Sequence, residues 1–99
     1  MILQNQAVPI LAFTNHQPEP GMQPHRGVVL ARYHRQFVTW DCYRADEDEE
    51  WHCESGHYFA NDLDLAKYSF GMRVAHAIET ITEEAAKRGL MSGLKVMPM

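Results

Sequence analysis

The residues best suited to chemistry in this 99-residue chain are its two cysteines and six histidines. Cys42, His52, Cys53 and His57 lie close together in the sequence. Two thiolates and two imidazoles can bind zinc in a tetrahedron, but the chain has no Cys-x-x-Cys pair and no helical histidine pair four residues apart. Neighbouring residues of a strand point to opposite faces, so His52 and Cys53 cannot both ligate one ion from a regular strand. A small metal-binding or redox module that uses Cys42, Cys53 and His57 is kept as an alternative, and no cofactor is predicted.

Nucleophilic catalysis would need a thiolate beside a base, and Cys53 with His57 or His34 could supply that pair. Acidic neighbours raise the pKa of a cysteine, which opposes such activation. The chain also lacks a phosphate-binding glycine loop, a Gly-x-Ser-x-Gly turn and a His-Glu-x-x-His motif. We therefore expect a protein that is not an enzyme.

A run of five consecutive acidic residues extends from position 46 to position 50. Such a run repels itself and must stay hydrated, so it predicts an exposed loop. Its functional interpretation is a row of carboxylates that imitates phosphates and attracts a basic protein surface, and the alternative is a solvated turn. Large aromatic residues flank the run, and such residues are common both in cores and at binding hot spots. The predicted partner-binding residues are Trp40, Tyr43, Asp46, Glu47, Asp48, Glu49, Glu50 and Trp51.

A third class of function is nucleic-acid binding through Arg26, Arg32 and Arg35, which we expect to gather near one hairpin turn. The formal net charge of −4 argues against it, because neutralising phosphates supplies most of the affinity of such proteins.

The elements that must position these residues can be read from apolar spacing. The segments 28–33, 37–43 and 51–59 are rich in β-branched and aromatic residues and predict three strands. Asn61 and Asp62 supply a helix cap, and Arg88 and Gly89 close the helix. The expected fold is α+β: a three-stranded antiparallel β-meander packed by one long C-terminal helix. The helix is marked by an apolar stripe at Leu63, Ala66, Phe70, Val74, Ile78, Ile81 and Ala85.

The domain organisation follows from prolines and glycines at both ends. Residues 1–25 are expected to be an N-terminal arm or linker, residues 26–90 the α+β domain, and residues 91–99 a C-terminal tail. Both faces of the predicted strands carry apolar groups, whereas one helix covers only one face. This excess predicts a protein partner or a homodimer. No apolar run approaches the length of a membrane span, so we expect a cytoplasmic protein with reduced cysteines.

Several motifs follow one another along the chain: Phe37-Val38-Thr39-Trp40, the acidic turn, Gly56-His57-Tyr58-Phe59, Asp64-Leu65-Ala66, Phe70 and Arg73. This order resembles small uncharacterised proteins of bacterial plasmids, integrative elements and phages. The resemblance covers residues 28–73, and it implies no catalytic residues. Small acidic proteins of such elements are often inhibitors of host defence, of the anti-CRISPR or anti-restriction type. Together with the acidic run beside the aromatic residues, this leads us to expect a non-catalytic inhibitor that binds a basic, nucleic-acid-binding protein.

Overall fold

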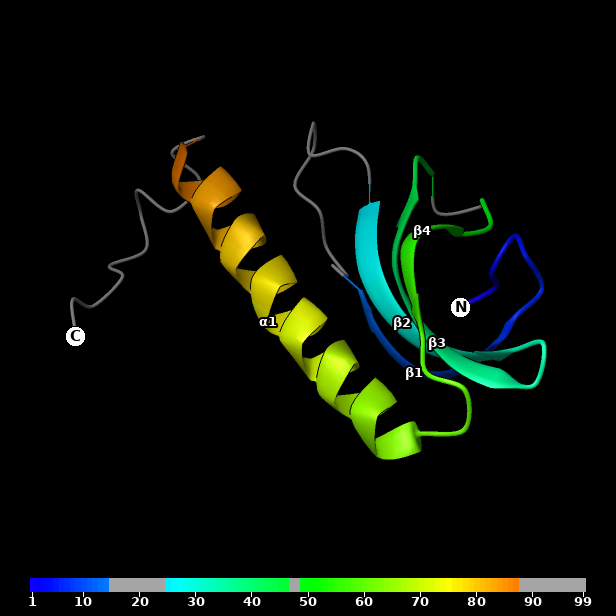
Figure 1. Ribbon diagram of the computed structural model, residues 1–99. Coiled ribbons are helices and arrows are strands. Elements are labelled where there is room, and N and C mark those ends of the chain that lie inside the picture. The colour runs from blue at the N-terminus through cyan, green and yellow to red at the C-terminus, as the bar shows by residue number, and fades with distance from the viewer. Residues whose placement is uncertain (15–24, 47–48, 88–99) are drawn as a thin grey trace.

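The computed structural model describes residues 1–14, 25–46 and 49–87 of the chain. Its four strands form one antiparallel sheet in the order β1-β2-β3-β4, and a single long helix lies on one face of it (Figure 1). The α+β fold with an antiparallel sheet and one C-terminal helix is confirmed, but the sheet has four strands and not three. The predicted tail, Arg88 and Gly89 lie outside the described residues. The elements are β1 (Val8–Thr14), β2 (His25–Tyr33), β3 (Gln36–Arg44), β4 (His52–Tyr58) and α1 (Leu63–Lys87).

The additional strand β1 comes from the segment that was predicted to be an arm or linker. It pairs antiparallel with β2, from Val8 opposite Arg32 to Thr14 opposite Gly27. The sheet tolerates Pro9, which has no N–H to donate, because β1 is an edge strand. The proposed boundary at residue 26 is therefore wrong for residues 8–14, which belong to the sheet of the domain.

The turn between β2 and β3 is as short as a hairpin allows. β2 ends at Tyr33 and β3 begins at Gln36, so His34 and Arg35 form the whole connection. Both have a positive φ, 49° and 65°, as a type I′ turn requires. Neither residue is Asn or Gly, so the turn is held by the pairing of the flanking strands at a local conformational cost.

Helix α1 begins where the sequence predicts. The Asp62 carboxylate accepts a hydrogen bond of 3.0 Å from the Leu65 N–H, which identifies Asp62 as the N-cap. The first part of the apolar stripe faces the sheet, since Ala66 is fully buried and Phe70 and Val74 are half-buried. Ile78, which was predicted in the same stripe, is 49% exposed, and the side chains of Ile81 and Ala85 lie outside the described part of the chain. The C-terminal end of α1 extends away from the sheet in Figure 1.

The opposite face of the sheet is covered by the chain's own N-terminus. Leu3 and Ala7 are buried there, in one cluster with Trp40, Trp51 and inward-facing residues of β2 and β3. Backbone hydrogen bonds fix the segment, because the Gln4 N–H donates to the Trp51 carbonyl and the Trp51 N–H donates to the Ile2 carbonyl, both at 2.9 Å. The prediction of a homodimer depended on an uncovered second face, and residues 1–7 cover it. The homodimer therefore stays a prediction without that support.

Candidate functional site

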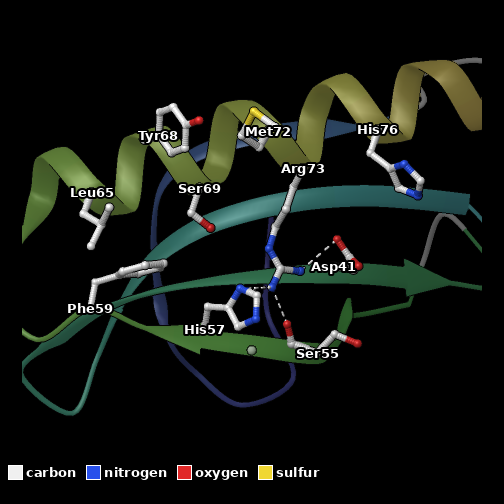
Figure 2. Close-up of a pocket in the computed structure, with 11 residues that line it drawn as sticks. Asp41, Ser55, His57, Phe59, Leu65, Tyr68, Ser69, Met72, Arg73 and His76 are labelled. Carbon is white, nitrogen blue, oxygen red and sulfur yellow. Dashed lines mark hydrogen bonds and ion pairs between the residues drawn. The ribbon is translucent and has the colours of Figure 1, made fainter.

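A groove of about 650 Å³ runs between α1 and β4 on the helix-covered face of the sheet (Figure 2). One end is apolar, where Leu65 of the helix approaches Phe59, the residue that follows β4. The middle is polar and contains Asp41 of β3, His57 of β4 and Arg73 of the helix. The groove thus combines an apolar wall with a small set of polar groups, as binding sites usually do.

The helix side of the groove exposes large apolar side chains. Leu65, Tyr68 and Met72 have exposed fractions of 50%, 67% and 57%. Their spacing of three and four residues places them on one face of α1, next to the stripe that packs on the sheet. Packing among the residues that the structure describes does not explain an exposed line of this kind.

The polar part of the groove is organised by Arg73. Its Nη1 lies 3.0 Å from a carboxylate oxygen of Asp41, and its Nη2 donates to the Ser55 carbonyl. The same Nη2 lies 3.2 Å from Nδ1 of His57 (Figure 2). A guanidinium only donates, so Nδ1 of His57 is the acceptor and the ring is the Nε2–H tautomer. The side chain of Arg73 is 12% exposed, so it joins α1 to β3 and β4 beneath the groove.

A second polar contact fixes the helix on the sheet. The hydroxyls of Thr39 in β3 and Ser69 in α1 lie 2.8 Å apart, and Thr39 is fully buried. A buried hydroxyl without a partner costs about 1–3 kcal/mol, so this pair favours one position of α1. The two walls of the groove are therefore held at a defined separation.

Charged side chains gather next to the groove. Asp41 and Glu54 are directly opposite each other on β3 and β4. Arg73 pairs with Asp41, and Arg26 lines the same hollow. Two carboxylates and two guanidiniums balance here, so any negative surplus comes from the acidic run. Glu49 and Glu50, which precede β4, are also exposed. This end of the sheet is therefore suited to a cationic group.

The predicted partner-binding residues do not form one surface. Trp40 and Trp51 are 4% and 3% exposed and belong to the core under the N-terminal segment, so their prediction as contact residues is wrong. Their burial follows from the pairing of Trp51 with residues 2–4, which sequence spacing does not reveal. Tyr43 is 37% exposed and stacks on His52 with ring centroids 5.2 Å apart. Of the acidic run, Asp46, Glu49 and Glu50 are exposed, while Glu47 and Asp48 lie outside the described residues.

The register of the strands separates the residues of the metal-binding alternative. Cys42 and Cys53 are directly opposite each other and share the face covered by the N-terminus. His57 pairs with Thr39 and lies on the other face, beside Arg73. Within the part of the chain that the structure describes, no three His, Cys, Asp or Glu side chains converge as metal ligands.

The three arginines of the nucleic-acid-binding alternative are also separated in the structure. Arg32 and Arg35 lie at the His34-Arg35 turn, whereas Arg26 lies near the other end of β2, opposite Tyr43. Arg32 is six positions after Arg26 along β2, a distance of about 20 Å. Arg32 also stacks over the Phe37 ring, 5.2 Å from its centroid. The prediction that the three arginines gather at one turn is wrong.

The sequence reasoning did not identify the groove residues. The signal was present as a second apolar spacing at Leu65, Tyr68 and Met72, on the helix face next to the stripe at Ala66 and Phe70. The periodicity predicted the buried stripe, but only the tertiary structure shows that the second spacing borders a groove.

None of the protein-family models, curated proteins or solved structures compared with this chain matches it. The resemblance to proteins of mobile elements therefore stays a prediction. Among the described residues, the structure has no helix with the length and apolar character that a membrane crossing requires.

Proposed function

We propose that the protein is a non-catalytic protein-binding module that holds its partner in the groove between α1 and β4. The observation that carries the proposal is the exposed apolar line of Leu65, Tyr68 and Met72 beside this groove. Exposed apolar side chains that line a groove are typical of interaction sites, because a partner that covers them removes apolar area from water.

The edge of the sheet favours an extended segment as the occupant. β4 is the last strand of the sheet, and among the described residues no strand pairs with its outer edge. The N-terminal segment bridges only to Trp51, just before β4 begins. An open edge beside a helix can accept a peptide as an additional strand, with main-chain hydrogen bonds for affinity and side-chain contacts for selectivity.

Charge favours a basic partner. The exposed Glu49 and Glu50 attract Lys or Arg side chains that flank the apolar anchor. Such a peptide or surface occurs on proteins that bind nucleic acid. Inhibition of a host-defence protein of this kind is the finer form of the proposal, and the charge of this end of the sheet supports it.

Selection from a random peptide library tests the proposal. We expect selected peptides to combine apolar residues with Lys or Arg, and to shift the amide resonances of β4 and α1. Leu65→Ser should weaken the binding of a selected peptide by about tenfold or more, as expected for the loss of one apolar anchor. Ile78→Ser is the matched control, because Ile78 is equally exposed, 49% against 50%, but does not line the groove.

A second arm tests the electrostatic part. Replacing Asp46, Glu47, Asp48 and Glu49 with Ser should weaken binding at low salt, with a smaller effect at high salt. Equal losses in the Leu65 and Ile78 variants, or selected peptides that shift only the face covered by the N-terminus, would contradict the groove as the binding site.

A further inference from the structure

Cys42 and Cys53 are directly opposite each other on β3 and β4, and both are free thiols. Residues opposed in this way have Cα atoms about 4.5–5.5 Å apart, within the range of about 4.4–6.8 Å that a disulfide accepts. Their side chains also lie on the same face of the sheet. A bond between the two sulfurs therefore requires little movement of the backbone.

A β-bulge aligns the pair. The register between β3 and β4 shifts by one residue between Thr39, which is opposite His57, and Asp41, which is opposite Glu54. Without this shift Cys42 would be opposite Glu54, and the two sulfurs would lie on different faces. The bulge is formed at a cost, because Ser55 has a φ of 56°, in the left-handed region that residues with a Cβ rarely adopt.

The two thiols differ in access and in ionisation. Cys42 is 3% exposed, whereas Cys53 is only partly buried. The hydrogen bond between the two side chains lowers the pKa of Cys53, and one with Asn5 of the N-terminal segment adds to this, although partial burial opposes both. The same hydrogen bond and burial raise the pKa of Cys42. Cys53 is thus the more acidic and more accessible thiol of the pair, and Cys42 is the less acidic and shielded one.

We propose that Cys42 and Cys53 form a thiol–disulfide exchange site that is oxidised by low-molecular-weight disulfides. The Cys53 thiolate attacks one sulfur of the small disulfide, which breaks its S–S bond and releases one small thiolate. Cys42 then loses its proton and attacks the Cys53 sulfur, which releases the second small thiolate. The small disulfide gains two electrons, and the two protein thiols become one disulfide. The two released thiolates take up the protons that the protein thiols lose.

The site lies apart from the groove but next to the acidic run. The disulfide closes a loop that contains residues 43–52, and a closed loop has fewer conformations than an open one. This constraint acts mainly on the unfolded chain, because the folded strands already hold Cys42 opposite Cys53. The exchange itself does not depend on the proposed binding of a partner.

The test uses the reduced, folded protein and oxidised glutathione as the small disulfide. After acid quenching and alkylation, mass spectrometry should show the wild type losing two hydrogen atoms and both alkylatable thiols. Cys42→Ser should accumulate a mixed disulfide on Cys53. Cys53→Ser should react at least about tenfold more slowly, because its remaining thiol is buried and protonated.

Two measurements keep the test independent of how well the variants fold. Peptide mapping of early time points in the wild type should place the mixed disulfide on Cys53. The native rate should also fall less than the rate of the urea-unfolded chain when the pH is lowered from about 8.5, the ordinary pKa of a thiol. Mixed disulfides at equal rates on both cysteines, purely intermolecular disulfides, or two intact thiols in the wild type would each overturn the proposal.

Discussion

The N-terminal segment covers the second face of the sheet, which the sequence predicted to be exposed, and Leu3→Ala tests this cover. Leu3 is 3% exposed and belongs to the cluster that contains Trp40 and Trp51. Replacing a buried leucine by alanine costs about 2.7–5 kcal/mol, as lost transfer free energy and a residual cavity. A terminal segment can partly collapse onto the cavity, so we expect about 3 kcal/mol. The backbone bonds of residues 2 and 4 to Trp51 are retained.

Urea unfolding followed by tryptophan fluorescence measures this cost, because both tryptophans lie in the cluster that Leu3 covers. With a slope of about 1.3 kcal/mol per M, a loss of 3 kcal/mol lowers the unfolding midpoint by roughly 2 M. Ile2→Ala is the matched control, since Ile2 is the neighbouring residue and is 70% exposed. It should change the free energy of unfolding by less than about 0.5 kcal/mol. Equal midpoints for the two variants would refute the assignment of residues 1–7 as the cover of this face.

Substitutions at three further places test the contacts that shape the groove and the sheet. Arg73→Met removes charged hydrogen bonds to β3 and β4 and should cost about 2 kcal/mol in urea unfolding, while Arg73→Lys should cost less. Gly56→Ala should cost about 1–3 kcal/mol, because the added Cβ would lie 2.6 Å from Nε1 of Trp40, and a shifted tryptophan emission should accompany the loss. His34→Asn with Arg35→Gly should stabilise the protein by about 1 kcal/mol and raise its Tm by about 4–8 °C in a thermal scan, because both positions have a positive φ. A lowered Tm would contradict the turn geometry.

The elements of the fold could be predicted because their signals are local. Capping by Asp62, the apolar periodicity that buries Ala66, and the β-branched and aromatic runs of β2 and β3 depend on residues within a few positions of each other. The strand β1 was missed because Pro9 and the following proline-rich segment indicate a linker. The sheet can include this proline-containing segment as an edge strand because the segment pairs with β2, which lies beyond the proline-rich stretch in the sequence.

The candidate site was misread where it depended on contacts between distant segments. Trp40 and Trp51 have the composition of a binding hot spot, and only the N-terminal segment decides that they are core residues. Strand alternation correctly separated His52 from Cys53, because alternation is a local rule. The spacing did not reveal the bulge at Ser55, which places His57 and Cys53 on different faces.

By itself the sequence determined the type and order of β2, β3, β4 and α1, because hydrogen bonding and side-chain alternation within a segment specify strands and helices. It also determined that the described acidic residues between β3 and β4, Asp46, Glu49 and Glu50, are exposed, since like charges stay in water wherever the chain places them. The tertiary structure decided which residues meet: Leu3 with Trp51, Arg73 with Asp41, and Cys42 with Cys53. These contacts depend on the register between strands and on which face of the sheet each segment covers. A register shift of one residue would move every side chain of a strand to the opposite face.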